Sequence, residues 1–205
     1  DQIYTARRYG QIVCKAIAYR STLSTSRASA KRLIRGRDVE GGAAKIPDHE
    51  RAYRGLRAMV LYGELAPGEP VTIQGLAERV DLGMTPVREA IRRLTSQGAL
   101  VFKGNRRVEV PELTLAQFGE LSFVRRNVEP ELARRAVENM EDFHIDQLAA
   151  EDAAVDAAIE NGDVRGYLEH NHLFHAQLYA LSGADVLIAI SEMLWLRSGP
   201  PLRVM

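Results

Sequence analysis

The stretch TPVREAIRRLTSQG, residues 85–98, decides the fold. Its apolar side chains recur at the spacing of one helical face, which predicts an amphipathic helix that buries this face. The inner face holds Val87, Ala90, Ile91 and Leu94. Arg88 and Arg92, four residues apart, then share an exposed edge. The segment therefore predicts a short helix with a cationic outer edge, in a chain whose formal net charge is zero.

Turn and cap residues mark the limits of this helix and of two helices before it. Thr85 suits an N-cap and Pro86 the first helical position, while Gly98 suits the end. Asp48 and Thr72 suit the N-caps of two earlier helices, which the Pro-Gly turn in LAPGEPVT separates. The sequence thus predicts three helices, and the four residues DLGM join the second to the third.

A basic hairpin follows the third helix. The segments ALVF and RRVEV alternate, and KGN joins them. Three helices with a short turn and a hairpin make a winged helix-turn-helix, which we assign to residues 48–111. In this arrangement the third helix fits the DNA major groove. The wing, with Lys103, Arg106 and Arg107, can lie along the backbone or the minor groove.

The charges divide unevenly along the chain. Residues 1–111 hold twenty Lys and Arg against eleven Asp and Glu, while residues 112–205 hold seven against sixteen. This pattern fits a polyanion-binding module joined to a second domain, and the alternative is mutual attraction between two oppositely charged domains. The single cysteine, Cys14, excludes an internal disulfide and a thiolate zinc site. No apolar run approaches the roughly 18 residues of a membrane span, so we expect a cytoplasmic protein without membrane contact.

Residues 1–47 form a basic N-terminal extension. It holds nine basic and three acidic residues up to Glu40, then the linker-like EGGAAKIPD, and it shows no long apolar periodicity. The extension either contacts DNA phosphates or is a disordered addition to the domain.

Residues 112–205 are predicted to form an all-helical bundle. Thr114, Asp142, Asp163 and Asp185 each stand at the start of a helical segment, and Pro130 is expected to kink or restart the first helix. No stretch here alternates at period two. The expected fold is therefore mainly α, with an N-terminal winged helix-turn-helix, its small β-hairpin wing, and a helical bundle after it.

The first domain resembles a known family. GELAPGE, LAERV, TPVREAIRRLTSQGAL and the hairpin are similar to the DNA-binding domain of the GntR family of bacterial transcription regulators, over residues 48–111. The motif PVREA is the most specific part, and the resemblance implies that Arg88 contacts the operator.

Two positions depart from that family. Gly83 and Met84 stand where relatives commonly have Ser-Arg, and Gln74 stands where some have Arg. An Arg-to-guanine contact contributes about 1 to 3 kcal/mol of discrimination, so the operator cannot be taken from relatives. Met84 either touches a thymine methyl or makes no base contact. The expected DNA-binding residues are Gln74, Met84, Thr85, Arg88, Arg92, Lys103, Arg106 and Arg107.

The helical half resembles the FCD-type ligand-sensing domain of the FadR-type branch of this family. FVRRNVEPELA, NGD and NHLFHAQLYALSG carry the resemblance over residues 114 to about 197. It implies that Arg125 faces a ligand cavity, and that Asn171 and His175 begin a site for a divalent metal, zinc or nickel. From the residues alone, Asn171 and His175 lie one turn apart and could hold one ion or one carboxylate, or His175 is an ordinary core residue. His172 is expected to face solvent.

The chain ends at Met205, before the last helices of such a bundle. We expect the bundle in residues 112–205 to be incomplete, which would expose Leu187, Ile188, Leu194 and Trp195 unless another chain covers them. Metal ligands on later helices would be missing too, because no histidine follows His175.

The function expected from these observations is transcription regulation rather than catalysis. A homodimer would bind a two-fold operator, and a small molecule, expected to be a carboxylate, would bind near Arg125 and change the spacing of the two DNA-binding heads. One alternative is a DNA-silent sensing or scaffold protein, which Met84 and Gln74 motivate. The other is a metal-dependent enzyme in the helical half, against which stands the absence of HExxH, a nucleophile elbow and a glycine-rich phosphate loop.

Overall fold

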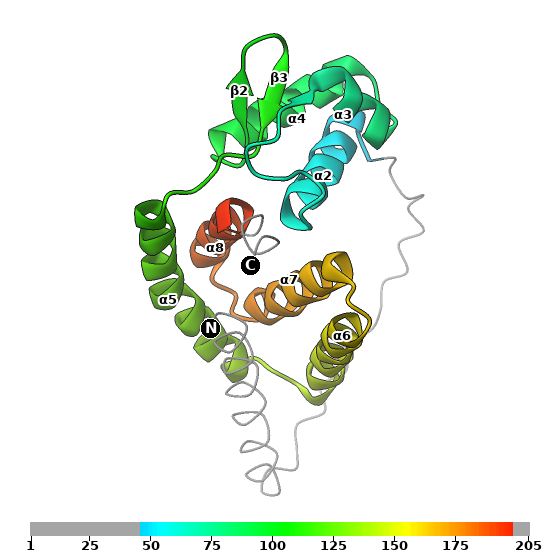
Figure 1. The fold of residues 1–205 in the computed structure, drawn as a ribbon. Coiled ribbons are helices and arrows are strands. Elements are labelled where there is room, and N and C mark those ends of the chain that lie inside the picture. Colours follow the sequence, from blue (N-terminus) through cyan, green and yellow to red (C-terminus); the bar gives the residue numbers. More distant parts are fainter. Residues whose placement is uncertain (1–45, 199–205) are drawn as a thin grey trace, which may run out of the picture. The chain divides into compact units, whose positions relative to one another are not determined.

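The structure is a computed structural model that describes residues 46–198. In this part the chain is mostly helical with one small sheet, and the elements follow one another as Figure 1 shows. They are α2 (Asp48–Leu61), β1 (Val71–Thr72), α3 (Ile73–Val80), α4 (Met84–Ser96), β2 (Val101–Lys103), β3 (Arg107–Glu109), α5 (Leu115–Glu138), α6 (Asp142–Glu160), α7 (Val164–Ala180) and α8 (Asp185–Ser198). The mainly helical fold with a small wing is confirmed. The basic segment 1–45 lies outside the described residues.

The winged helix consists of α2, α3 and α4 with a three-stranded antiparallel sheet in the order β1-β3-β2. Val108 of β3 pairs with Val71 of β1 on one side and with Phe102 of β2 on the other. The sequence predicted the hairpin of β2 and β3 but only an extended piece at β1. A two-residue strand carries no alternation, and its partner lies far along the chain.

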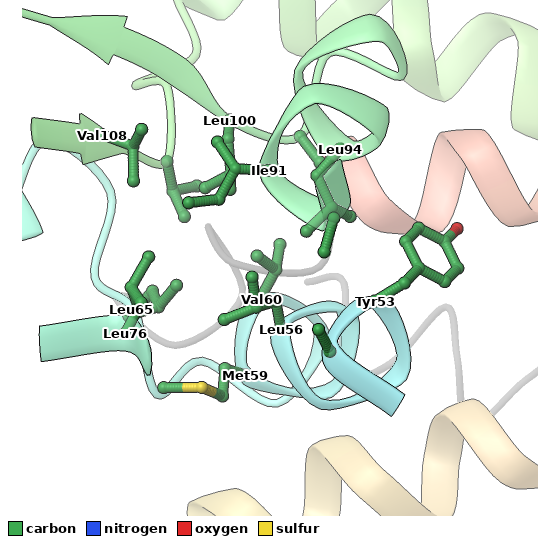
Figure 2. Packing of buried hydrophobic residues seen from close by; sticks show 14 of the residues in the cluster. Tyr53, Leu56, Met59, Val60, Leu65, Leu76, Ile91, Leu94, Leu100 and Val108 are labelled. Atoms are coloured by element: carbon green, nitrogen blue, oxygen red, sulfur yellow. The ribbon is translucent and has the colours of Figure 1, made fainter. Parts of the chain in front are cut away.

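One apolar core joins these elements. Figure 2 shows side chains of α2, α3, α4 and the sheet pointing toward one another. The four residues predicted for the inner face of α4 are at most 2% exposed, as the helical spacing requires. A second group in this core comes from α8, where Trp195 and Leu196 are buried against the winged helix.

The helix ends agree with the sequence in most places, but the N-cap predicted at Asp48 is wrong, because Pro47 is the N-cap and Asp48 is the first residue of α2. Thr72 caps α3 by accepting a hydrogen bond from the backbone N–H of Gly75, and Gly98 takes a φ of 73° just after α4. The predicted start of α4 is wrong. Gly83 is the N-cap and the helix begins at Met84, so Thr85 makes no capping bond and Pro86 is the third helical residue. Pro86 fits there because the first-turn N–H groups have no intrahelical acceptor.

The helical half contains four helices. Thr114 and Gln117 form a capping box at the start of α5, and Asp163 caps α7 through the N–H of Gly166. Of the two outcomes predicted at Pro130, a restart does not occur, because α5 runs through it from Leu115 to Glu138. This helix packs on α7 and α8, and that packing holds it together across the missing backbone hydrogen bond.

The end of α8 also differs from expectation. Leu194 and Trp195 are 3% and 6% exposed, so the chain itself covers two of the four apolar residues that we expected to be exposed. The other two, Leu187 and Ile188, are half-buried. Winged-helix core residues take part in that cover. Among the described helices, none is long and apolar enough to cross a membrane.

Candidate nucleic-acid interface and effector site

The outer edge of α4 carries two arginines without intramolecular partners. Arg88 and Arg92 are exposed, and within residues 46–198 neither makes a side-chain hydrogen bond or an ion pair. Thr85, in the first turn of the same helix, is exposed as well. These three side chains are therefore free to contact a ligand from one edge of a helix that the core holds rigidly.

Arg93, next to this edge, has a structural role instead. Its Nη1 donates to Oε2 of Glu50 at 3.2 Å, and its Cζ lies 3.5 Å from the centroid of the Tyr53 ring. Hydrogen bonds from Arg54 and, more weakly, from Arg93 hold the pKa of Glu50 below its usual value. The third arginine of the α4 cluster thus joins α4 to α2.

In the wing, too, one cationic side chain is paired with a carboxylate and two are not. Lys103 pairs with Glu109 at 2.8 Å, so a carboxylate already neutralises it. Arg106 and Arg107 are exposed and have no ion-pair partner in the described part of the chain. Asn105 and Arg106 take φ values of 62° and 56°, a left-handed conformation that costs a residue with a Cβ roughly 1–2 kcal/mol. The wing therefore presents two arginines at its tip, one on strained backbone.

The two positions that depart from the family pattern differ in exposure. Gln74 is exposed on α3, where its Nε2 donates to Oε1 of Glu78 at 3.1 Å. Met84 is half-buried and packs against the winged-helix core. Its side chain is therefore partly committed to packing, which leaves less of it for a base.

Arg125 of α5 lies at the centre of a polar cluster in the helical half. Its Nε donates to Oε1 of Glu129 at 2.7 Å, and its Nη1 donates to Oγ of Ser198 at 3.1 Å. Its Cζ lies 4.6 Å from the centroid of the Trp195 ring. A longer contact of 3.5 Å joins Nη2 to the second oxygen of Glu129. A guanidinium has five N–H groups, so two of them remain for an anion.

His175 lies close to this cluster. Its ring centroid is 5.2 Å from that of Trp195, and its Nδ1 is 3.2 Å from the hydroxyl of Tyr179. Burial, then the positive charge of Arg125 and the nearby His172, lowers the pKa of His175 to about 3. The imidazole is thus neutral at pH 7, and Nε2 is the nitrogen left for a ligand.

The prediction that His172 faces solvent is wrong. His172 is 8% exposed and sits edge-on to two rings, with centroid distances of 6.1 Å to Tyr62 and 5.5 Å to Trp195. Burial and, to a lesser degree, Arg57 lower its pKa to about 4. The error arose because α7 has two covered faces, one against the bundle and one against the winged helix, and the sequence pattern shows only one stripe.

Among the described residues, few side chains that could bind a metal ion lie near Asn171 and His175. Within residues 46–198 no three side chains of His, Cys, Asp or Glu are grouped so that they could hold a metal ion. Asn171 is half-buried on α7 one turn before His175, and nearby His170 is paired with Glu151 at 2.9 Å. Asn171 and His175 thus have no third His, Cys, Asp or Glu beside them among the described residues with which to hold an ion.

Sequence reasoning missed three members of the Arg125 cluster. Trp195 was treated only as an apolar surface residue, and neither Glu129 nor Ser198 was considered. Glu129 had a usable signal, because an acid four residues after an arginine on one helix pairs with it. Trp195 and Ser198 come from a helix about seventy residues away, so only the tertiary structure brings them to Arg125.

Comparison with known proteins identifies both halves of the chain. The model of the gntR family of bacterial regulatory proteins matches residues 48–110, and that of the FCD domain matches residues 120–204. The HTH-type transcriptional regulator McbR of Escherichia coli (strain K12) is 33% identical over 147 residues, 72% of this chain and 66% of McbR. The HTH-type transcriptional repressor RspR of the same organism is 29% identical over 140 residues, 68% of this chain and 61% of RspR. The chain thus spans somewhat less than two thirds of the length of these relatives.

Solved structures agree with this match. The structure of E. coli McbR/YncC superposes with a TM-score of 0.73 at 30% identity, covering 78% of this chain and 75% of that one. A putative transcriptional regulator GntR from Rhodococcus sp. RHA1 gives a TM-score of 0.61 at 22% identity, covering 77% and 75%. The second structure shares the fold.

Proposed function

This chain belongs to the GntR family of bacterial regulatory proteins and carries an FCD domain, and from that premise we propose that it is a DNA-binding transcription regulator. In the proposal it acts in the cytoplasm as a homodimer on a two-fold operator and is not an enzyme. The observation that carries the proposal is the exposed, unpaired edge of α4 with Arg88 and Arg92. The arginines of the wing tip supply the second contact.

The proposed DNA contacts come from the basic side chains of α4 and the wing that have no ion-pair partner among the described residues. Arg88 and Arg92 enter the major groove with α4, where an arginine can bind guanine through two hydrogen bonds. Arg106 and Arg107 of the wing contact the sugar-phosphate backbone or the minor groove. Lys103 has the smallest part in this group, because Glu109 already compensates its charge.

The proposed effector is a small carboxylate bound at Arg125. Two N–H groups of its guanidinium remain for an anion, and Nε2 of the neutral His175 can donate or accept one further hydrogen bond. Asn171 offers an amide one turn away on the same helix. Glu129 competes for Arg125, so an effector binds only if it improves on that contact or shares the guanidinium with it.

Trp195 gives this site a physical route to the winged helix. Its ring contacts Arg125 and His175, and its side chain belongs to the core that α4 also forms. The same helix, α8, meets the end of α4, since a Cβ built on Gly98 would lie 3.3 Å from Nε of Arg197. An effector that moves Trp195 therefore repacks the DNA-binding domain, and it changes operator affinity only as far as it prefers one packing.

The test of DNA binding begins by selecting bound duplexes from a random pool with the wild-type protein. The affinity for the selected duplex is then measured against salt concentration. A regulator loses affinity steeply as salt rises, because phosphate contacts release counterions. Arg88→Ala should weaken binding at every salt concentration, whereas Arg134→Ala, an exposed arginine on α5, serves as the matched control and should change little. No enriched duplex and no salt-dependent binding would favour the DNA-silent alternative.

The effector site is tested separately by a thermal shift assay with a panel of small carboxylates. An effector that binds only the folded protein raises Tm, because it stabilises the folded state by RT ln(1 + L/Kd), where L is the free effector concentration. The shift should be lost in Arg125→Lys, because an ammonium cannot reproduce the geometry of the guanidinium. If a carboxylate raised the Tm of this variant as much as that of the wild type, its binding site would not be at Arg125.

A further inference from the structure

The C-terminal end of α4 is closed by backbone hydrogen bonds around Gly98. This glycine has a φ of 73°, in the left-handed region that glycine adopts at little cost. Its N–H donates to the carbonyl of Thr95 at 3.0 Å, and the N–H of Ala99 donates to the carbonyl of Leu94 at 2.9 Å. These two bonds form the Schellman arrangement that ends many helices. The helix that carries the proposed DNA contacts therefore ends in one defined conformation.

A side chain of α8, Arg197, covers this glycine. A Cβ built on Gly98 would lie 3.3 Å from Nε, 3.4 Å from Cδ and 3.8 Å from Cζ of Arg197. The shortest of these distances is tighter than nine in ten Cβ contacts in proteins, so a side chain at position 98 would push the arginine away. Glycine is thus required here for its backbone conformation and for the approach of Arg197.

The charge of Arg197 has no acidic partner in the described part of the chain. The residue is half-buried, and its side chain makes no ion pair and no hydrogen bond within residues 46–198. The last carbonyl groups of a helix carry partial negative charge, because no intrahelical N–H is left to pair with them. A cation beside them is attracted, most strongly where solvent is partly excluded. Arg197 therefore brings a positive charge from the helical half to the end of α4.

The same turn of α8 is attached to Arg125. Oγ of Ser198 accepts a hydrogen bond from Nη1 of Arg125 at 3.1 Å and donates one to the carbonyl of Leu194 at 2.8 Å. Ser198 is 2% exposed, so little water reaches this hydroxyl to replace either bond. Arg197 precedes Ser198 in the chain. The last turn of α8 thus contacts the candidate effector arginine through one residue and α4 through its neighbour.

We propose that Arg197 is a positioning residue for DNA binding, because it fixes the end of α4 and so the direction in which this helix presents its free arginines. The proposal rests on the DNA-binding function proposed above and adds its regulation. An effector that draws the guanidinium of Arg125 away from Ser198 frees the last turn of α8. Arg197 then loses its place on Gly98, and operator binding weakens.

Two glycine substitutions test the contact in the full chain. Gly98→Asn supplies a residue that tolerates the left-handed region, but its side chain displaces Arg197. Gly183→Asn is the matched control, because Gly183 has a φ of 62° and nothing lies within 4 Å of a Cβ built on it. Affinity for the duplex selected with the wild-type protein should fall at least about fivefold in Gly98→Asn and stay within about twofold in Gly183→Asn. Equal effects in the two variants would overturn the proposal.

Substitutions of the arginine separate its charge from its packing. Arg197→Met keeps an unbranched apolar stem without the charge, whereas Arg197→Lys keeps a cation. Affinity should fall about fivefold in Arg197→Met and be largely retained in Arg197→Lys. Arg126→Ala removes an exposed arginine of α5 without an ion-pair partner among the described residues, so it controls for net charge and should change affinity little. Equal losses in the two variants of Arg197, or no loss in either, would contradict the proposal.

Double variants test whether these residues act together. In an Arg197→Ala background, Gly98→Asn should cause no further loss of affinity, because the side chain that it displaces is absent. Ser198→Ala, which removes the bond to Arg125, should likewise add nothing to Arg197→Ala. Additive losses in the first pair would overturn the proposed contact, and additive losses in the second would overturn the proposed link to Arg125.

Hydrogen exchange provides a measurement that needs no DNA. The amides of Gly98 and Ala99 should exchange at least about threefold faster in Arg197→Met than in the wild type, while those of α6 keep their rates. Unchanged rates at both amides would overturn the proposal. All affinities are measured well below the Tm of each variant, so that unfolded protein does not imitate a loss. A wild-type protein that selects no duplex would refute the proposed function itself, whereas full duplex affinity in Arg197→Met would refute only the role of Arg197.

Discussion

At the scale of single residues, the arginines of α4 have two roles that the sequence does not separate. Arg88 and Arg92 are free, whereas Arg93 is bound to Glu50 and stacks on Tyr53. All three side chains are exposed. Glu50 and Tyr53 of α2 hold Arg93, whereas no described side chain of α2 makes a hydrogen bond or ion pair with Arg88 or Arg92.

Arg93→Ala should therefore affect stability, whereas Arg88→Ala should affect DNA binding. Arg93→Ala should lower the free energy of unfolding by about 1 kcal/mol, because an exposed ion pair and a cation–π contact are lost. Arg88→Ala should leave stability within about 0.5 kcal/mol and weaken DNA binding instead. Denaturant unfolding and DNA titration of both variants provide the check. A destabilised Arg88→Ala would mean that its guanidinium is not free.

Arg106 predicts a conflict between stability and binding. Its backbone φ of 56° is easy for glycine and costly for arginine, so Arg106→Gly should raise or maintain Tm. The same change should weaken DNA binding because the wing tip loses a cation. Thermal melts and duplex affinity must be measured on the same preparation. Lower stability with unchanged affinity would show that the side chain has only a structural role.

The two buried histidines predict acid sensitivity. Their pKa values are about 4 for His172 and about 3 for His175 in the folded chain, and 6.5 when exposed. Below pH 6.5 the unfolded chain therefore binds more protons than the folded one, and stability falls as pH falls toward 4. Each histidine contributes up to about 1.4 kcal/mol per pH unit.

Melting curves between pH 7.5 and 4.5 would measure this loss. In His172→Phe the decline should be shallower, because one of the two proton-linked groups is gone. Leu115→Ala, a change at an exposed residue that leaves both histidines in place, should reproduce the wild-type curve. Parallel curves for wild type and His172→Phe would contradict the assignment of the effect to His172.

At the scale of elements, the sequence predicted what is periodic or capped. The buried face of α4, the N-caps at Thr72, Thr114 and Asp163, and the hairpin are all signalled within a few residues, and the structure confirms them. The errors occur where tertiary contacts override local preference. At Pro130 the neighbouring helices keep α5 continuous, although a proline there removes a backbone hydrogen bond.

The candidate sites were less predictable than the elements. Exposure of Arg88, Arg92, Arg106 and Arg107 follows from local spacing, so the DNA-facing surface could be proposed from sequence. The surroundings of Arg125 could not, because Trp195 and Ser198 reach it from α8. For the same reason the second covered face of α7 had no signature in the sequence.

A leucine-to-alanine change on the buried face of α4 should cost much of the free energy of unfolding, whereas the same change at an exposed leucine should cost almost none. Leu94→Ala should lower the free energy of unfolding by about 2–5 kcal/mol, because Leu94 is fully buried in the core that Figure 2 shows. Leu115→Ala makes the same chemical change at a residue that is 91% exposed, and the effect should stay within about 0.5 kcal/mol. Denaturant unfolding measures both. Similar losses would mean that the helix faces are misassigned.

At the scale of the whole chain, Trp195 belongs to two functional parts at once. It stacks with His175 and Arg125 and is 6% exposed within the winged-helix core. Trp195→Leu should keep an apolar side chain in that core while removing the aromatic contact with the candidate effector site. We expect operator affinity to persist in this variant while its response to the carboxylate effector falls at least fivefold. A full response would mean that the signal travels by another path.

Because Trp195 is shared by the candidate effector site and the winged-helix core, DNA binding should also affect effector binding. Coupling between two equilibrium binding sites is reciprocal, so whatever factor the effector applies to operator affinity, the operator applies to effector affinity. A regulator bound to its operator would then have a different affinity for the effector from one that is not bound to DNA. The number of promoter copies would itself help to set the metabolite concentration at which transcription changes.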